Sequence, residues 1–184
     1  MPAPQNWKLL SSQYLHQDKW LNVKAGTYQK GEDGPIITPF YTFEYPAWVN
    51  IFAITEDRQV IVNQQYRPGL DQVCLELPAG WVEADETPEA CAKRELLEET
   101  GYQANKLQQT GAISANPSTH NNLNYCFLAE NVKLVQEQRL DLEEEIMVQL
   151  MPIEEVKRLA LAGAFVQSLH ISAIFFALEI LEGR

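Results

Sequence analysis

Short runs rich in aromatic and β-branched residues, separated by polar turns, recur along the first half of the chain, and such runs predict β-strands. The segments with the clearest strand pattern are 20–24, 39–45, 48–55, 60–64 and 73–77. Residues 31–35 read Gly-Glu-Asp-Gly-Pro, which is typical of a turn, and Glu-Asp-Arg at 56–58 indicates a hairpin. We therefore expect residues 8–45 to form short strands broken by turns.

The second half of the chain mixes strand patterns with helical ones. Thr87 can cap a helix that begins at Pro88 and runs to about Thr100, and Gly101 then provides a C-terminal stop. Further strands are expected at 107–114, 123–129 and 146–150, and further helices at 153–162 and 166–181. The last helix is apolar nearly all round, which predicts burial against the sheet or against another subunit. This order of elements predicts an α+β layered domain.

Composition narrows the class of protein. A chain of 184 residues with 46% hydrophobic residues can bury a sizeable core. The formal net charge of −11, with no basic cluster to offset it, argues against binding to nucleic acid or to an anionic membrane. The start of the chain lacks the pattern of a signal peptide, and no apolar stretch is long enough to span a bilayer.

The cysteines and histidines predict neither a disulfide framework nor a zinc site. The three cysteines form no Cys-x-x-Cys pair and are expected to be reduced thiols, which suits a cytoplasmic protein. The three histidines are scattered, so their spacing predicts no zinc site.

The most informative stretch is the acidic run at 80–102. Four of its carboxylates lie at fixed offsets around Arg94, namely Glu86, Glu95, Glu98 and Glu99. Helix positions three and four apart are neighbours, so the last three acids share one face of the helix. Carboxylates so close repel one another unless a cation holds them. Oxygen ligands of this kind suit Mg²⁺ or Mn²⁺; the alternative is a solvated acidic helix face.

Residues beside the helix can complete such a site. Arg94 and Glu98 are four apart and can pair, and Glu86 lies ahead of the helix, where it can reach Arg94 as a supporting partner. Gly80 allows a tight backbone turn, which would offer the carbonyl of Ala79 as a further oxygen ligand.

The run resembles the Nudix box, Gly-x5-Glu-x7-Arg-Glu-U-x-Glu-Glu-x-Gly-U, in which U is a bulky aliphatic residue. Only Tyr102, at the last position, departs from it. The resemblance implies a Nudix fold, an α/β/α sandwich with a mixed central sheet, and Mg²⁺- or Mn²⁺-dependent hydrolysis of a nucleoside diphosphate linked to another moiety. It also implies that Glu95 and Glu99 are the leading metal ligands, completed by Glu98 and the Ala79 carbonyl.

The flanks are similar to one branch of that family, the ADP-ribose and nucleoside-diphosphate-sugar pyrophosphatases. The matching features are Gln65-Tyr66-Arg67-Pro68, Glu76-Leu77-Pro78-Ala79-Gly80, Pro117 and Asp18-Lys19-Trp20. The resemblance implies two regions, a small antiparallel β-sheet region at 1–45 for dimerisation and base stacking, and a Nudix hydrolase domain at 46–184. A homodimer is the implied assembly.

Three aromatic residues and one arginine are the candidates for binding the nucleotide. Arg67 can clamp a diphosphate as a bidentate donor, or can form a surface ion pair instead. Trp20 can stack on the base opposite Phe40 or Tyr41 of a partner subunit; the alternative is that these rings serve only packing.

The segment at 115–122 departs from relatives that prefer ADP-ribose, because Ser118 replaces a glycine and amides replace an acid. Ser118, His120 and Asn121 can hydrogen-bond the hydroxyls of a hexose, which favours a GDP-sugar such as GDP-mannose as an alternative substrate. An ordinary polar turn is the other interpretation.

A second acidic segment, residues 141–145, precedes the strand expected at 146–150. In the branch that the chain resembles, a mobile loop here supplies a general base. Glu144 matches best, with Glu143 and Glu145 as rivals, and Glu98 of the box is a further catalytic candidate. The alternative is a solvated acidic turn.

Two classes of function follow. The first is a Mg²⁺-dependent pyrophosphatase that converts ADP-ribose or a related nucleoside diphosphate sugar to a nucleoside monophosphate and a sugar phosphate. The second is a Nudix module that binds a nucleotide and regulates a partner without hydrolysis, although such modules usually lack box acids that this chain retains.

Overall fold

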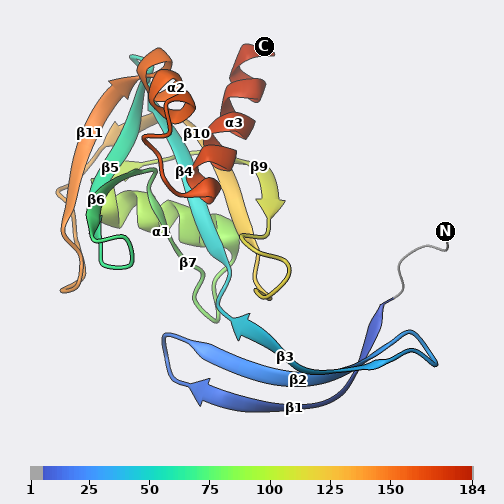
Figure 1. Cartoon of the computed structure of the whole chain (residues 1–184). Helices are drawn as coiled ribbons and strands as arrows, with labels where there is room; N and C mark the ends of the chain where they lie inside the picture. The colour runs from blue at the N-terminus through green and yellow to red at the C-terminus, as the bar shows by residue number, and fades with distance from the viewer. Residues whose placement is uncertain (1–5, 184) are drawn as a thin grey trace. The chain divides into compact units, whose positions relative to one another are not determined.

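A computed structural model describes residues 6–183, which form two compact units (Figure 1). The first unit contains residues 6–45 and 114–122, and the second contains residues 46–113 and 123–183. Within the described part of the chain, none of the helices has the length and apolar character needed to cross a membrane.

The first unit is built on a three-stranded antiparallel sheet. Its strands are β1 (Trp7–Gln17), β2 (Asn22–Lys30) and β3 (Ile36–Glu44), in the order β1-β2-β3. Every residue of β1 is exposed. Residues 114–122 join this unit at Phe43, whose N–H donates to the carbonyl of Thr119 at 2.7 Å and whose carbonyl accepts from the N–H of Asn121 at 3.2 Å.

The early strands differ from the sequence prediction. They are long, and the strand expected at 20–24 begins only at Asn22, because Trp20 lies in the turn before it. The carboxylate of Asp18 accepts the N–H groups of Trp20 and Leu21 at 2.7 and 2.8 Å. A local side-chain turn of this kind overrides the strand preference of an aromatic residue.

The second unit contains an eight-stranded sheet with the order β11-β5-β4-β10-β8, in which β6 pairs with β5, β7 with β4 and β9 with β10. Its strands are β4 (Trp48–Thr55), β5 (Gln59–Arg67), β6 (Gln72–Glu76), β7 (Ala79–Trp81), β8 (Tyr102–Gln103), β9 (Leu107–Ile113), β10 (Asn124–Leu134) and β11 (Ile146–Pro152). Strands β4 and β10 are parallel and the other pairs antiparallel, so the sheet is mixed. The short strands β7 and β8 have no counterpart in the sequence prediction.

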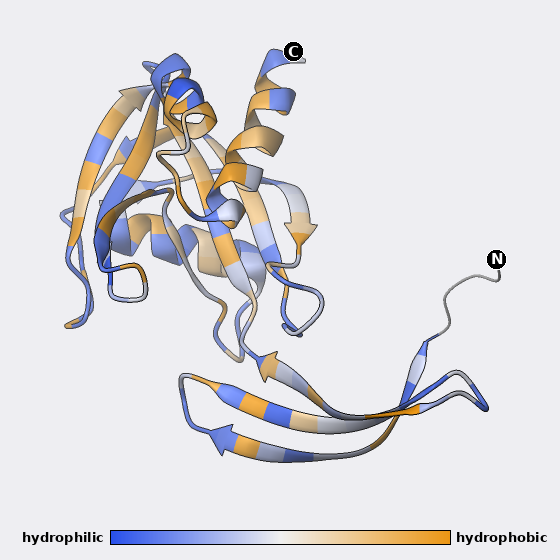
Figure 2. Cartoon of the chain, viewed as in Figure 1, coloured by the Kyte–Doolittle hydropathy of each residue, from blue (hydrophilic) through white to orange (hydrophobic). Residues whose placement is uncertain are grey.

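Helices cover both faces of this sheet: α1 (Pro88–Thr100) on one, α2 (Ile153–Leu161) and α3 (Ser168–Glu182) on the other (Figure 1). Alternate residues of β4 serve the two cores, with Ile51 packed in the cluster of α1 and Phe52 in the cluster of α3. Figure 2 shows α3 as apolar over most of its length, as expected for a buried helix. The predicted α/β/α arrangement is therefore confirmed.

Strands β4 and β5 separate from each other near the centre of the sheet. Strands β4 and β5 pair directly only at Ile54 and Val60; beyond that pair, β5 pairs with β6 and β4 pairs with β7. Leu77 and Pro78 carry the chain from β6 to β7, and the carbonyl of Pro78 accepts the N–H of Ile51 at 2.9 Å. This crossing brings the residues before the acidic helix into the middle of the sheet.

Candidate metal and diphosphate site

The most buried carboxylate on the acidic face of α1 is Glu99, near the C-terminal end of the helix. Its Oε2 accepts the side-chain N–H of Asn63 at 2.9 Å and the backbone N–H of Ala79 at 3.1 Å. Burial, followed by repulsion from the Glu95 carboxylate, raises the pKa of Glu99 well above its ordinary value. The helix begins at Pro88 as predicted, because Oγ1 of Thr87 caps it by accepting the N–H of Ala90 at 3.2 Å.

Glu95 lies directly against the glycine that opens the box. A Cβ on Gly80 would stand 2.0 Å from Cδ of Glu95, so the Glu95 side chain can lie here only while residue 80 is glycine. Burial raises the pKa of Glu95 to about 7, although the nearby Arg94 guanidinium lowers it in part. Gly80 therefore has a steric role in the site.

Arg94 forms hydrogen bonds to three acids of the box. It donates from Nε and Nη2 to Glu86 at 3.0 and 2.8 Å, and from Nη1 to Glu95 at 2.8 Å and Glu98 at 3.1 Å. Nη2 also donates to the carbonyl of Trp81 at 3.1 Å. The structure thus brings Glu86 and Arg94 together, and Arg94 fixes the box helix to β7.

The donor set has the chemistry that a divalent cation needs. Carboxylate oxygens are the ligands that Mg²⁺ prefers, and burial, which disfavours the ionised form, raises the pKa of both Glu95 and Glu99. Within residues 6–183, no three His, Cys, Asp or Glu side chains already stand as a metal-holding group. Arg94 instead bonds to one oxygen of each of two box acids, Oε1 of Glu95 and Oε2 of Glu98.

Two residues that precede the second acidic segment, Gln138 and Arg139, form hydrogen bonds to the end of α1. The N–H of Arg139 donates to the carbonyl of Glu98 at 2.8 Å, and Nε2 of Gln138 donates to the carbonyls of Glu99 and Ile146 at 2.5 and 3.2 Å. The residues just before the acidic segment are therefore bonded to the end of α1, and Gln138 is also bonded to the first residue of β11.

Glu144 is the acid of this segment that acts electrostatically on the box. It is half-buried, whereas Glu143 and Glu145 are exposed. Burial is the largest cause of the raised pKa of both Glu95 and Glu99, and the negative charge of Glu144 is a smaller cause of both. Glu143 and Glu145 are not among the causes of these shifts. A tight turn orients Glu144: its N–H donates to the carbonyl of Asp141 at 3.0 Å, and its carboxylate accepts the N–H of Asp141 at 3.1 Å.

Arg67 is paired within the protein. Its Nε and Nη2 donate to the two carboxylate oxygens of Glu76 at 2.8 and 2.5 Å. Burial alone would raise the pKa of Glu76, but the hydrogen bonds from Arg67 and the nearby His170 ring lower it to about 2. The Arg67 side chain is 45% exposed and that of Glu76 only 7%, so the pair presents its cationic end to solvent.

The aromatic candidates of the first unit have different surroundings. Trp20 is 50% exposed, with Nζ of Lys19 4.1 Å from its ring centroid. Phe40 packs edge-on against Trp7 and Tyr28, with centroids 5.7 and 5.8 Å away. Consecutive residues of a strand point to opposite faces, so Phe40 and the exposed Tyr41 cannot both face one nucleobase.

Residues 114–122 use part of their polar chemistry inside their own unit. Oδ1 of Asn121 accepts the N–H of Tyr45 at 3.1 Å, and the His120 ring packs edge-on against Phe43 and Tyr45, with centroids 5.7 and 5.2 Å away. Ser118 is exposed, and its N–H donates to Oδ1 of Asn116 at 3.3 Å.

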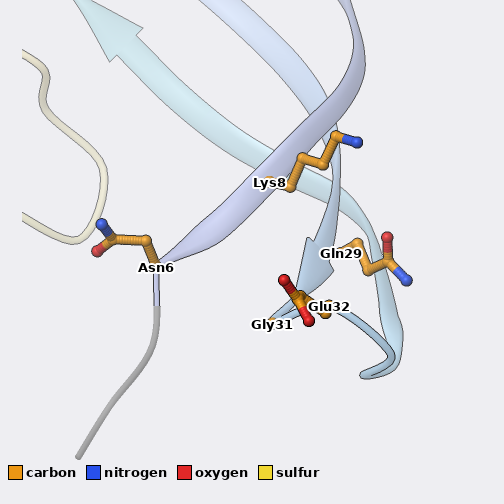
Figure 3. A pocket seen from close by; sticks show the side chains of 5 residues that line it. All are labelled: Asn6, Lys8, Gln29, Gly31 and Glu32. Carbon is orange, nitrogen blue, oxygen red and sulfur yellow. The ribbon is translucent and has the colours of Figure 1, made fainter.

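A pocket in the first unit is separate from all these candidates. Figure 3 shows its lining, which comes from the residue before β1, from β1 and β2, and from the turn after β2: Asn6, Lys8, Gln29, Gly31 and Glu32. None of the site residues predicted from the sequence lines it.

Four residues that support the site were not predicted from the sequence, namely Asn63, Glu76, Gln138 and His170. Asn63 ends the apolar run of β5 and His170 lies in the apolar α3, and both are buried. A polar residue inside an apolar run is a signal that could have identified these two, because a buried polar group requires a partner.

Comparisons with known proteins bear on the family. An ADP-ribose pyrophosphatase of Bacillus subtilis (strain 168) is 36% identical over 110 residues, which cover 60% of this chain and 59% of that protein. An ADP-ribose pyrophosphatase of Mycobacterium tuberculosis is 27% identical over 183 residues, which cover 98% of this chain and 87% of that protein. The match to the Bacillus protein thus spans about six tenths of its length.

A solved structure of an ADP compounds hydrolase superimposes with a TM-score of 0.86, covering 100% of this chain and 98% of that one at 21% sequence identity. At this identity the likeness shows the fold. The family model of the NUDIX domain matches residues 44–169, which include the whole acidic helix and its flanking strands. The protein therefore belongs to the Nudix family.

Proposed function

We propose that the protein is a Mg²⁺- or Mn²⁺-dependent pyrophosphatase that hydrolyses ADP-ribose or a related nucleoside diphosphate sugar. The observation that carries this proposal is the set of carboxyl groups on one face of α1, Glu95, Glu98 and Glu99, of which Glu99 is buried and the Glu95 side chain is only 12% exposed. Two relatives that match this chain are named ADP-ribose pyrophosphatases, which supports the same substrate class.

The metal ligands in this proposal are Glu95, Glu98, Glu99 and the carbonyl of Ala79. A bound divalent ion supplies charge neutralisation for the diphosphate and lowers the pKa of an attacking water. Arg94 and Glu86 orient the ligand carboxylates, and Asn63 keeps Glu99 in place from β5.

Glu144 is the proposed general base. Its carboxylate takes a proton from the water as the water oxygen forms a bond to phosphorus. The P–O bond to the bridging oxygen breaks, and that oxygen leaves on the second phosphate. The products are a nucleoside monophosphate and a sugar phosphate. The half-buried position of Glu144 and its electrostatic effect on Glu95 and Glu99 support this choice over Glu143.

Substrate recognition is assigned to other residues. Arg67 donates to the diphosphate through the exposed part of its guanidinium, while Glu76 keeps the group oriented. Trp20, Phe40 and Tyr41 are the candidates for stacking on the base, and Ser118, His120 and Asn121 are the candidates for the terminal sugar.

We also propose that the protein acts as a homodimer. Strand β1 exposes large apolar side chains along its length: Trp7, Leu9, Leu10, Tyr14 and Leu15. A patch of this kind on a sheet is typical of a protein–protein interface. A second copy that covers β1 would bury these side chains and would place Trp20, at the end of the β1–β2 turn, beside the interface.

A turnover panel tests the function. Purified protein with Mg²⁺ is incubated with ADP-ribose, GDP-mannose and UDP-glucose, and the release of nucleoside monophosphate is measured. Turnover that is fastest on ADP-ribose supports the proposal, whereas fastest turnover on GDP-mannose would move the substrate to the GDP-sugars, which the polar residues at 115–122 favour. Binding of all three without any product would support the regulatory module instead.

A further inference from the structure

A buried histidine on α3 stands at the crossing between β6 and β7. His170 is 1% exposed, in a helix that is otherwise packed into the core by Ala173, Ile174 and Ala177. It lies outside the acidic box, and the proposed reaction does not use it. A buried imidazole in an apolar helix requires partners, and those partners determine what it does.

The hydrogen bonds of His170 fix its tautomer. Nδ1 accepts the backbone N–H of Leu77 at 3.1 Å and the side-chain N–H of Asn50 at 2.9 Å. A nitrogen that accepts these bonds carries no proton, so the proton of the neutral ring lies on Nε2. Nε2 is 3.6 Å from Oε2 of Glu76, which directs an N–H towards a carboxylate.

The two sides of the ring therefore act on two parts of the site. On the Nε2 side, Glu76 holds Arg67 through two hydrogen bonds. On the Nδ1 side, Leu77 begins the segment that leads through Pro78 to Ala79, whose N–H is held by Glu99. One imidazole thus contacts both the carboxylate that orients Arg67 and the backbone that leads into the box.

We propose that His170 is a positioning residue that ties α3 to the site, aligning Arg67 through Glu76 and Ala79 through Leu77. The kinetic consequences of this inference rest on the proposed function. Its structural consequences rest only on the hydrogen bonds of Nδ1 and on the contact between Nε2 and Glu76. Loss of the Nε2 contact loosens Arg67 and weakens substrate binding. Loss of the Nδ1 contact loosens the Leu77–Ala79 segment and reduces turnover.

Two conservative variants separate the two contacts. In His170→Asn the side-chain carbonyl lies near the position of Nδ1 and can still accept the N–H of Leu77, but nothing reaches Glu76. In His170→Gln the longer side chain brings its amide near the position of Nε2, where it can donate to Glu76, and the acceptor for Leu77 is lost. His170→Phe fills the space and removes both contacts.

The kinetic result expected is a split between KM and kcat. Since loss of a supporting hydrogen-bond partner typically costs about 10- to 100-fold, His170→Asn should raise KM roughly tenfold or more at nearly unchanged kcat. His170→Gln should lower kcat by a similar factor with a smaller change in KM, and His170→Phe should show both changes. Ser172→Ala is the control on the same helix, because the Ser172 hydroxyl bonds only inside α3, and it should match wild type.

A second readout does not depend on activity. Amide hydrogen exchange of Leu77 and Ala79, followed by NMR, should stay slow in wild type and His170→Asn and become at least tenfold faster in His170→Gln and His170→Phe. If the wild-type protein hydrolyses no nucleotide, the proposed function fails while the exchange result still decides the role of His170.

Equal effects would overturn the inference. If His170→Asn and His170→Gln change KM, kcat and amide exchange alike, in proportion to their loss of thermal stability, then His170 serves only core packing. Should His170→Phe fail to fold, the comparison of the Asn and Gln variants decides the question by itself.

Discussion

Glu99 and His170 hold the same short segment from opposite faces of the sheet. Glu99 of α1 accepts the N–H of Ala79, and His170 of α3 accepts the N–H of Leu77, both at 3.1 Å. Pro78, between them, bonds to β4 through its carbonyl. The backbone that precedes Gly80 is therefore fixed by three elements, and the position of the Glu95 carboxylate against Gly80 depends on all of them.

Replacement of Glu99 by Gln should remove most of the activity and leave the fold intact. The amide oxygen can still accept the N–H groups that Glu99 Oε2 accepts, but the negative charge for a cation is lost. We expect kcat to fall by at least roughly a hundredfold, since even supporting residues of metal sites cost up to that much. Glu89→Gln is the matched control, because Glu89 is an exposed acid of the same helix that pairs with Lys93. Wild-type turnover by Glu99→Gln would contradict the metal-site assignment.

Gly80→Ala should damage the site through sterics alone. The new Cβ would overlap Cγ, Cδ and Oε1 of Glu95, so this side chain would have to leave its place beside Arg94. We expect weaker Mn²⁺ binding, measured by titration, and a lower kcat. Gly69→Ala is the control, because a Cβ added there would meet no atom within 4 Å and the φ of Gly69 is ordinary. Equal Mn²⁺ affinity in both variants would show that Glu95 does not need this space.

The metal-free protein should lose stability as the pH rises from about 4.5 to 7. The folded-state pKa of Glu95 is about 7 against 4.5 for the free group, so across this window the folded state binds more protons than the unfolded state. The free energy of unfolding then falls with pH, by at most about 3 kcal/mol from this group. The raised pKa of Glu99 acts in the same direction.

Denaturant unfolding in a chelator at pH 5 and pH 8 measures this effect. Saturating Mg²⁺ should restore most of the stability at pH 8, because the ion binds the ionised carboxylates. Glu95→Gln should reduce the difference between the two pH values, whereas Glu89→Gln should leave it unchanged. An equal pH dependence in wild type and Glu95→Gln would rule out Glu95 as its source.

Among the acids at 143–145, replacement of Glu144 should have the largest effect on turnover. Loss of a general base typically costs about 10²- to 10⁴-fold in rate. We expect Glu144→Gln to lower kcat within this range at neutral pH, and the exposed Glu143 and Glu145 to tolerate the same change. A larger loss for Glu143→Gln than for Glu144→Gln would transfer the role to Glu143.

Sedimentation should show a dimer, with a mass near twice the 21.0 kDa of one chain. Leu15→Glu places a charge on the exposed apolar surface of β1 and should shift the protein towards monomer. Gln167→Glu is the control, because Gln167 is an exposed residue of the second unit, away from β1 in the sequence. A wild-type protein that sediments as a monomer would remove both the dimer and the stacking of a base between subunits.

Short-range patterns in the sequence determined the acidic helix and most strands. Thr87, Pro88 and Gly101 define the ends of α1, and the three- and four-residue spacing of its acids needs no tertiary contact to place them on one face. The order of such elements predicted an α+β layered domain, and the α/β/α layering came from the resemblance to the Nudix family. Where two local preferences competed, as at Asp18 and Trp20, the pattern was wrong because the side-chain turn was stronger than the strand preference.

Tertiary structure decided which distant residues meet. Asn63 reaches Glu99 across 36 positions, and His170 reaches Leu77 across 93, so neither contact has a local signature. The grouping of residues 114–122 with Phe43 has the same origin. Such contacts depend on how β4 and β5 separate and on which helix covers which face. The sequence by itself determined the charges of the site, and the fold determined which groups hold them in position.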